Sequence, residues 1–330
     1  QVAASTYLKS VVEAEISGDT NSIRIEPFNL SVDNTQLSGA FGAKKGTLPH
    51  YDLTLQAENV NLDNYLPPLT TQEGEGLSEV LNGLWQKTQW TNNVDMNLQL
   101  SAGLIIFDST PWEKVVLNAA LQNGTLNVKR LAAGNVLKSK FEANGEVKGF
   151  GDKPQLNNVN YTFDTEDLRS WFERFEVNAP QVNLAAFQPF SSSGTVSVNG
   201  NRIWLKAENT NGDTESTYNG RITQAEGKYL LNGELQLRSP NASALLKNLQ
   251  LSYEPQEQNL GRLGLKTQIV GNADKFKMSD MQLSVGANTF QGTVGADLAR
   301  SVPYWVANLK INRFESERFM PKRSAAPRFG

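Results

Sequence analysis

Strict alternation of apolar and polar residues is the feature that most constrains how this chain can fold. Residues 94–100 (VDMNLQL) and 281–285 (MQLSV) place an apolar side chain at every second position. Because successive side chains of a β-strand point to opposite faces, this period predicts strands with one apolar and one solvated face. The same period recurs in residues 23–25, 28–32, 196–198, 203–207, 235–237 and 309–311.

Short polar links separate many of these strands. Residues 122–126 (QNGTL), 198–202 (VNGNR) and 210–214 (TNGDT) each contain an Asn-Gly pair, which is typical of tight hairpin turns. We therefore expect a mainly β fold. Its architecture is predicted to be an elongated antiparallel meander of repeated hairpins that forms a curved sheet or groove.

Three stretches follow a helical period instead, and we expect them to cover the apolar face of the adjacent sheet. One lies between Leu77 and Thr88. Another spans residues 168–175, after a Thr165 cap and the acids Glu166 and Asp167. The apolar positions of these two are Leu77, Val80, Leu81, Leu84 and Trp85, and Leu168, Trp171, Phe172 and Phe175; a third candidate is Asn241 with Leu245, Leu246 and Leu249.

A spaced motif of an aromatic residue and a glycine recurs along the chain. It reads Tyr218-Asn219-Gly220 and Phe290-Gln291-Gly292, with a longer spacer between Phe141 and Gly145, and with Leu37 before Gly39 in the earliest copy. In "LSVGANTFQGTVGADL" we predict that "GAN" is a turn and that Gly292 marks a bend or a close approach of another backbone. Roughly twenty residues after each glycine, a strand is predicted to end in a polar residue, and this spacing is typical of a repeat architecture. These polar residues are Asn59, Thr165, Ser239 and Asn312.

Length and composition leave the domain count open. The 330 residues, with a net charge of -3 and no cysteine, suit either two domains or one elongated, continuous repeat array. We divide the chain into residues 1–90 and 91–185, each with a short helix, and 186–330, with a basic C-terminal tail. The absence of cysteine excludes disulfides and thiolate sites, and the nearly neutral charge gives no reason to expect nucleic acid.

Catalytic machinery is not evident. His50 is the one histidine and lies at a predicted strand start without a nucleophile-elbow sequence, so we interpret it as a surface histidine. A metal site of the usual kind needs clustered ligands, and a second histidine is missing. The acids Glu73 and Glu75, Glu166 and Asp167, and Glu315 and Glu317 form pairs that a glycosidase could use, but capping and solvation explain them better.

Three further features have ordinary interpretations. Gly149-Phe150-Gly151 precedes no helical pattern, so it is not a phosphate loop. The basic tail, residues 322–328, is interpreted as a solvated terminus rather than a lipid-binding segment. The tryptophans could stack sugars in a carbohydrate-binding module, but a core role is favoured. They are Trp85, Trp90, Trp112, Trp171, Trp204 and Trp305.

Several of these runs together resemble the repeat of the AsmA-like family. They are "VVLNAALQNGTLNVKRLAAG", "FEANGEVKGFGDKPQLNNVNYTFDTEDL", "MSDMQLSVGANTFQGTVGADL" and "LTLQAENVNLDNYLP", within residues 23–321. The resemblance implies a periplasmic protein of a Gram-negative envelope, anchored to the inner membrane, whose β-groove transports phospholipid between membranes. It implies neither catalytic residues nor a cofactor. An N-terminal membrane helix, typical of the family, does not occur in this sequence, so we treat the chain as an excerpt whose anchor lies outside it.

We therefore expect a non-enzymatic protein that holds phospholipid acyl chains on its apolar face, with outer-membrane assembly components as further partners. The alternatives are a scaffold that supports outer-membrane assembly with a filled β-sandwich core, and a carbohydrate-binding sandwich. The sequence alone does not decide whether the apolar face closes into a barrel, meets a second sheet, lies under helices or holds a ligand. The positions predicted to face lipid are Leu98, Leu100, Leu117, Leu121, Leu126, Val128, Val196, Val198, Leu235, Leu237, Leu283, Val285, Leu309 and Ile311.

Overall fold

The computed structural model of the chain confirms a mainly β fold whose strands form an open, 17-stranded meander. It describes residues 10–32, 35–64, 89–149, 155–174, 183–225, 228–249, 255–272, 274–312 and 314–320. Contacts divide the chain into two units. Unit 1 comprises residues 1–165 and 195–200, and unit 2 comprises residues 166–194 and 201–330.

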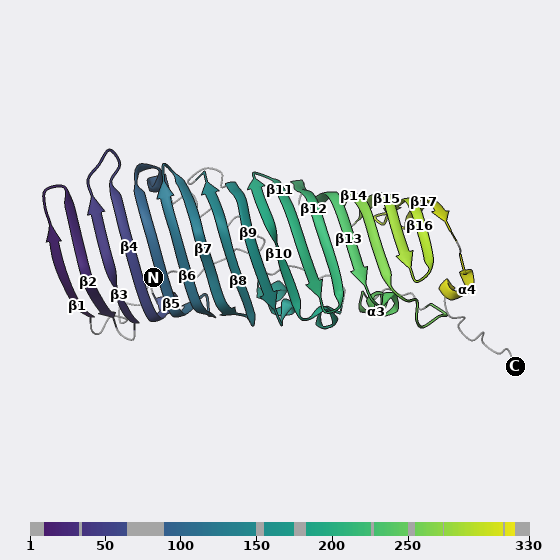
Figure 1. Ribbon diagram of the computed structural model, residues 1–330, viewed down its shortest axis with the longest axis horizontal. Helices are drawn as coiled ribbons and strands as arrows, with labels where there is room; N and C mark the ends of the chain where they lie inside the picture. Colours follow the sequence, from purple (N-terminus) through teal and green to yellow (C-terminus); the bar gives the residue numbers. More distant parts are fainter. Residues whose placement is uncertain are drawn as a thin grey trace. The chain divides into compact units, whose positions relative to one another are not determined.

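Unit 1 is a run of consecutive strands (Figure 1), and its described residues also form short 3-10 helices. Strand β10 (Phe190–Asn199) contributes its second half to this unit. The other strands are β1 (Ser10–Gly18), β2 (Ser22–Val32), β3 (Thr35–Lys44), β4 (His50–Asn61), β5 (Asp95–Phe107), β6 (Thr110–Gln122), β7 (Thr125–Val136), β8 (Ser139–Lys148) and β9 (Gln155–Thr165), and the 3-10 helices are η1 (Leu62–Asn64) and η2 (Gln89–Asn93).

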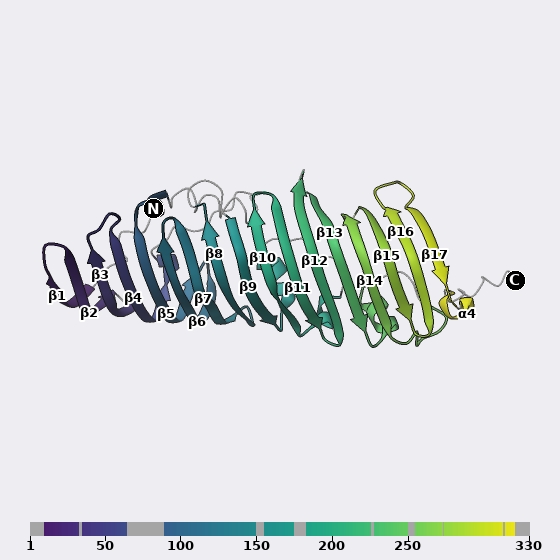
Figure 2. The same ribbon diagram turned by 45° about the horizontal axis from the view of Figure 1, so that its top comes forward.

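Unit 2 continues the same pattern and adds short helices (Figures 1 and 2). Its strands after β10 are β11 (Arg202–Asn211), β12 (Thr214–Ala225), β13 (Lys228–Ser239), β14 (Leu263–Gly271), β15 (Lys275–Val285), β16 (Asn288–Asp297) and β17 (Tyr304–Ile311). The helices are α2 (Leu168–Arg174), η3 (Leu184–Phe187), α3 (Ala242–Asn248) and α4 (Ser316–Phe319).

One strand pair departs from the predicted antiparallel meander. Strand β4 pairs with β5 in parallel, with His50 opposite Asp95 and Asn61 opposite Ile106. Parallel neighbours require a crossover connection of about a dozen residues or more, and residues 62–94 connect these two strands. The hairpin pattern of the sequence gave no indication of this crossover because the alternation within each strand is the same for both directions of pairing.

The helix predictions have different outcomes. Helix α3 is confirmed, with Asn241 as its N-cap: Asn241 Oδ1 accepts a hydrogen bond from Ala244 N at 3.0 Å. Helix α2 is also present, but its predicted Thr165 cap is wrong, because Asp167 Oδ1 accepts from Ser170 N at 3.2 Å instead. The candidate at residues 77–88 lies outside the described residues, as does Phe175.

Thr165 and Ser239 end their strands as predicted and Asn312 directly follows β17, whereas β4 continues past Asn59 to Asn61. Buried polar pairs recur at the first two of these strand ends. Ser139 begins β8 and donates through Oγ to Thr165 Oγ1, at the end of β9, at 2.7 Å. Thr214 begins β12 and donates through Oγ1 to Ser239 Oγ, at the end of β13, at 3.1 Å. All four residues are buried, and because a buried hydroxyl needs a partner, each pair fastens a strand start to the strand end beside it. A short helix follows both Thr165 and Ser239.

The glycine of the aromatic motif lies where a neighbouring strand comes close, as predicted. In β16, a Cβ at Gly292 would lie 2.0 Å from Asn308 O of β17, and its φ of +147° disfavours other residues. The turn before this strand comprises Gly286 and Ala287, which confirms the hairpin. Gly39, in the earliest copy, is equally close to its neighbour, since a Cβ there would lie 2.0 Å from Thr54 O.

Replacing Gly292 should therefore destabilise the sheet. We expect Gly292→Ala to lower the free energy of unfolding by about 2 kcal/mol, because the new Cβ meets backbone and the φ angle is unfavourable. Gly295→Ala, in the same strand, is the matched control, because its Cβ would meet Phe276 O at an ordinary 3.6 Å. Urea denaturation followed by far-UV circular dichroism measures both variants, and equal losses in the two would contradict this role for Gly292.

Candidate functional site

The candidate site is the apolar face of the sheet, which strand register makes continuous within each unit. In an antiparallel pair, directly opposed residues share a face. In unit 1, Leu100 lies opposite Leu117, and Leu117 lies opposite Leu131. Parallel pairing extends this face to β4, where Leu55 lies opposite Leu100. Side chains from consecutive strands therefore form one apolar surface.

The predicted lipid-facing residues of unit 1 lie together on this face. Leu98 is opposite Ala119, and Val128 is opposite the same Ala119 from the other side. Leu121 is opposite Leu126. For β10, Thr195 Oγ1 donates to Asn160 Oδ1 on the polar face, which leaves Val196 and Val198 on the opposite face. Leu121 is buried, and the other predicted positions of the unit are half-buried: Leu98, Leu100, Leu117, Leu126, Val128, Val196 and Val198.

The predicted residues of unit 2 also share one face, but protein side chains cover part of it. Leu283 and Val285 belong to a cluster in which Val285 packs with Ala242 of α3 and with Leu260. Phe319 of α4 packs against the same cluster and lies 6.2 Å from Phe290, ring centroid to ring centroid. The helices therefore cover this end of the face, as predicted. Leu235, Leu237 and Leu309 are half-buried, and Ile311 is 44% exposed.

The opposite face is polar, and it carries hollows in both units. A hollow of about 840 Å³ in unit 1 crosses a row of opposed residues that includes Asn29, Ser38, Gln56 and Ser101. Two more in unit 2, of about 900 and 350 Å³, lie over Arg238 and over Lys266. The alternation of the sequence predicts which face is polar but not how that face curves, so it gives no sign of these hollows.

His50 makes polar contacts near the start of β4. Its Nε2 lies 3.2 Å from Asp52 Oδ1, and Asn97 Nδ2 donates to Asp52 Oδ1 at 2.8 Å. The hydrogen bond from Asn97 lowers the pKa of Asp52 below its usual value, with His50 adding to the effect. His50 is thus a half-buried residue on the polar face of the sheet, with a carboxylate and an amide as its partners.

The acidic pairs have structural partners where they are described. Asp167 caps α2, and Glu315 lies 3.5 Å from the Arg318 guanidinium. Glu73 and Glu75 lie outside the described residues, as do residues 150–154 and the basic tail at 322–328. Within the described ranges, no group of three or more metal-ligating side chains is placed to hold an ion. No helix in this part of the chain has the length and apolar character needed to cross a membrane.

The prediction that the tryptophans belong to the core is wrong for two of them. Trp204 is 43% exposed and Trp305 is 57% exposed. Trp204 lies between Ile203 and Leu205, and because those two face the apolar side, Trp204 must face the polar side. Trp112 and Trp171 are half-buried, whereas Trp85 and the side chain of Trp90 lie outside the description.

Comparison of the chain with protein-family models, with curated proteins and with solved structures found no match.

Replacing the hydrogen-bond donor beside Asp52 should change its titration. We expect Asn97→Ala to raise the Asp52 pKa toward 3.8, because the hydrogen bond from Asn97 is the main cause of the lowering. The lowered pKa stabilises the fold above the unfolded-state pKa, and this contribution is lost as the pH falls through the folded-state pKa. The variant should therefore lose less stability on acidification.

Carboxyl carbon NMR during an acid titration measures the Asp52 pKa directly. Asn127→Ala is the control, because Asn127 is an exposed amide on the same polar face and lies opposite Ala120 and Glu146. An unchanged Asp52 pKa in Asn97→Ala would contradict the assignment.

Proposed function

We propose that this protein is a non-enzymatic lipid-handling protein of the bacterial envelope, which holds phospholipid acyl chains on the apolar face of its sheet. The observation that carries the proposal is the continuous apolar face of unit 1, where opposed leucines and valines follow one another across consecutive strands without a closed barrel. An acyl chain laid on such a surface gains about 0.8 kcal/mol for each methylene that it buries. Transfer along the face then requires no reaction chemistry.

Among the described residues, helices cover part of the apolar face of unit 2, and this favours unit 1 as the lipid-binding part. Within residues 10–64 and 89–165, the helices that the structure describes are η1 and η2, three and five residues long. Leucines in the middle of these strands remain half-buried, as Leu98 and Leu117 do. In unit 2, by contrast, α3 and α4 pack over Val285 and Phe290.

The resemblance of the repeat to the AsmA-like family supports the same proposal. It extends the proposal to a periplasmic location, to an inner-membrane anchor outside this chain and to outer-membrane assembly components as partners. The buried hydroxyl pairs at strand ends agree with a repeating β-architecture of this kind.

Lipid analysis of the purified protein tests the proposal. We expect phospholipid to co-purify with the protein and to be detected by mass spectrometry of an organic extract. Leu100→Asp should retain roughly tenfold less, because a carboxylate on the apolar face must lose water when hydrocarbon covers it. Gln99→Asp is the matched control, since it places the same charge on the polar face one residue away.

Circular dichroism spectra of both variants must match the wild-type protein for this comparison to hold. Leu117→Asn, a neutral change opposite Leu100, provides a milder variant with the same expected direction. A wild-type protein that retains no phospholipid, or equal retention by Leu100→Asp and Gln99→Asp, would contradict the proposal.

A scaffold that binds partners through a sheet edge is the second candidate, and one observation favours it. All nine residues of β1 are exposed, including Val12 at 67% and Ile16 at 69%. An exposed apolar edge strand is a template for strand addition by a peptide. Binding of an extended peptide that β1 substitutions abolish, without any retained lipid, would favour the scaffold over the lipid-handling function.

A further inference from the structure

One rim of unit 2 brings together strand ends that are far apart in the sequence. The antiparallel register aligns the first residues of β11, β13, β15 and β17 with the last residues of β12, β14 and β16. Arg202 is opposite Thr223, for example, and Asp297 is opposite both Lys275 and Tyr304. We call this edge the basic-aromatic rim.

Most of the exposed large apolar side chains of unit 2 lie on this rim. Twelve such side chains are exposed among the described residues of the unit, and nine belong to the rim. They come from both faces of the sheet, since the strand register places Trp305 on the apolar face and Val306 on the polar face. The rim itself, rather than one face, is therefore apolar. The nine are Trp204, Tyr229, Leu230, Val270, Leu298, Val302, Tyr304, Trp305 and Val306.

Cations surround these apolar side chains. The described part of the rim holds six exposed cations and two carboxylates. Counting Glu226, which lies outside the described residues, as a third carboxylate leaves an excess of three positive charges. The cations are Arg202, Arg221, Lys228, Lys275, Lys277 and Arg300, and the carboxylates are Asp274 and Asp297.

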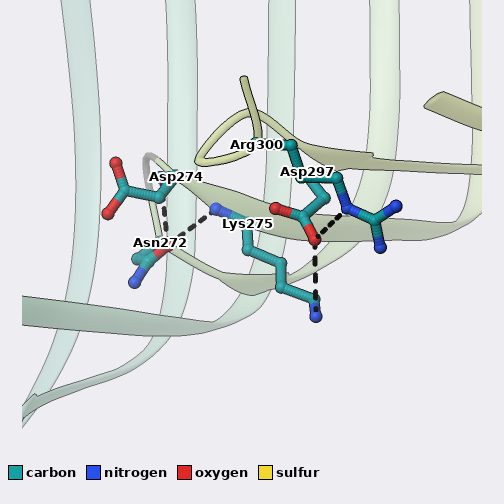
Figure 3. A network of polar contacts seen from close by, with 5 residues as sticks. All are labelled: Asn272, Asp274, Lys275, Asp297 and Arg300. Atoms are coloured by element: carbon teal, nitrogen blue, oxygen red, sulfur yellow. Dashed lines mark hydrogen bonds and ion pairs between the residues drawn. The ribbon is translucent and has the colours of Figure 1, made fainter. Parts of the chain in front are cut away.

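Both carboxylates of the rim are occupied by cations. Lys228 Nζ lies 2.8 Å from Asp274 Oδ2. Asp297 Oδ2 lies 3.0 Å from Arg300 Nε and 3.8 Å from Lys275 Nζ, and Figure 3 shows both side chains pointing to this one oxygen. Arg300 also lies over the Tyr304 ring, with its Cζ 4.7 Å from the centroid.

Three of the cations remain available for a ligand. Arg202, Arg221 and Lys277 have no ionic partner within the described residues. Arg221 and Lys277 belong to the same row of opposed polar-face residues as Trp204 and Val270. Unpaired positive charge is thus placed beside exposed apolar surface.

We propose that the basic-aromatic rim docks on the surface of a membrane that contains anionic phospholipid. Tryptophan and tyrosine are favoured at the membrane interface because their rings are apolar and their N–H and O–H groups are polar. Long Lys and Arg side chains place their charges among phosphates while their methylenes stay in the apolar region. The excess of cations matches an anionic surface.

This docking surface is separate from the lipid-holding face. The proposed function concerns acyl chains on Leu100 and its neighbours in unit 1, whereas the rim belongs to unit 2 and meets intact bilayers. Each can therefore fail without the other. A nucleic acid also offers phosphates, but it gives no reason for the aliphatic members of the rim, such as Val302, which is 75% exposed.

Vesicle sedimentation with the full chain tests the rim. We expect binding to vesicles of phosphatidylcholine with 30% phosphatidylglycerol (roughly physiological anionic content) and much weaker binding to pure phosphatidylcholine. Salt should weaken the binding, because ions screen exposed charges. Arg221→Glu combined with Lys277→Glu should lower the partition coefficient at least about tenfold. Trp204→Ser combined with Val302→Ser should lower it by a similar factor at high salt.

Lys247→Glu combined with Lys310→Glu is the matched control, because both lysines are exposed in unit 2 but lie away from the rim. It should bind as the wild-type protein does. All variants should keep the wild-type circular dichroism spectrum and retain phospholipid in the extraction assay, which separates this proposal from the proposed function. Three results would overturn the rim: equal binding to neutral and anionic vesicles, an equal loss in the control, or binding of a DNA duplex without binding of vesicles.

Discussion

In a β-sheet, each residue lies on the same face as the residue opposite it in the neighbouring strand. The apolar face of this protein, and the side chains that cover it, depend on that pairing. Leu55, Leu100 and Leu117 belong to three different strands, yet register places them in one line on one side of the sheet. Because the sheet is open, closure into a barrel does not hide this line of side chains. The apolar face must be covered by something other than sheet closure, and in unit 2 the described helices cover part of it.

Unit 2 covers part of its apolar face with its own chain. Asn241 begins α3 directly after β13 ends at Ser239, so the helix returns over Leu263 and Val285. The phenyl rings of Phe290, Phe314 and Phe319 then pack against one another at the adjacent end. In unit 1, the corresponding pair of hydroxyl groups at the end of β9 is also followed by a short helix, α2, whose residues belong to unit 2.

Features that depend on neighbours in the sequence were predictable, and features that depend on register were not. Alternation located the strands, and Asn241 and Gly292 were recognised from local chemistry. The parallel pairing of β4 with β5 could not be predicted, because the period of two carries no strand direction. Asp167 replaced Thr165 as the helix cap because Thr165 stays in its strand, bonded to Ser139, 26 residues earlier.

The candidate site was predictable in the same limited sense. The face shared by Leu98 and Leu121 follows from alternation, whereas its cover does not. Tryptophan is usually buried, which favours a core position for Trp204, but its neighbours Ile203 and Leu205 already face the apolar side of the sheet. The basic-aromatic rim could not be predicted from the sequence. Its residues are spread over positions 202–306 and become neighbours only because the strand register aligns the strand ends.

The paired hydroxyls at strand ends have a consequence for how such a chain comes apart. Each strand makes its backbone hydrogen bonds with the strands beside it. The stability of such a protein therefore depends on contacts between neighbouring strands more than on one shared core. Two hydroxyl pairs add side-chain hydrogen bonds between neighbouring strands: Ser139 with Thr165, and Thr214 with Ser239. Under a pulling force we expect such a chain to unfold in successive steps. Each step would end at one of these hydroxyl pairs.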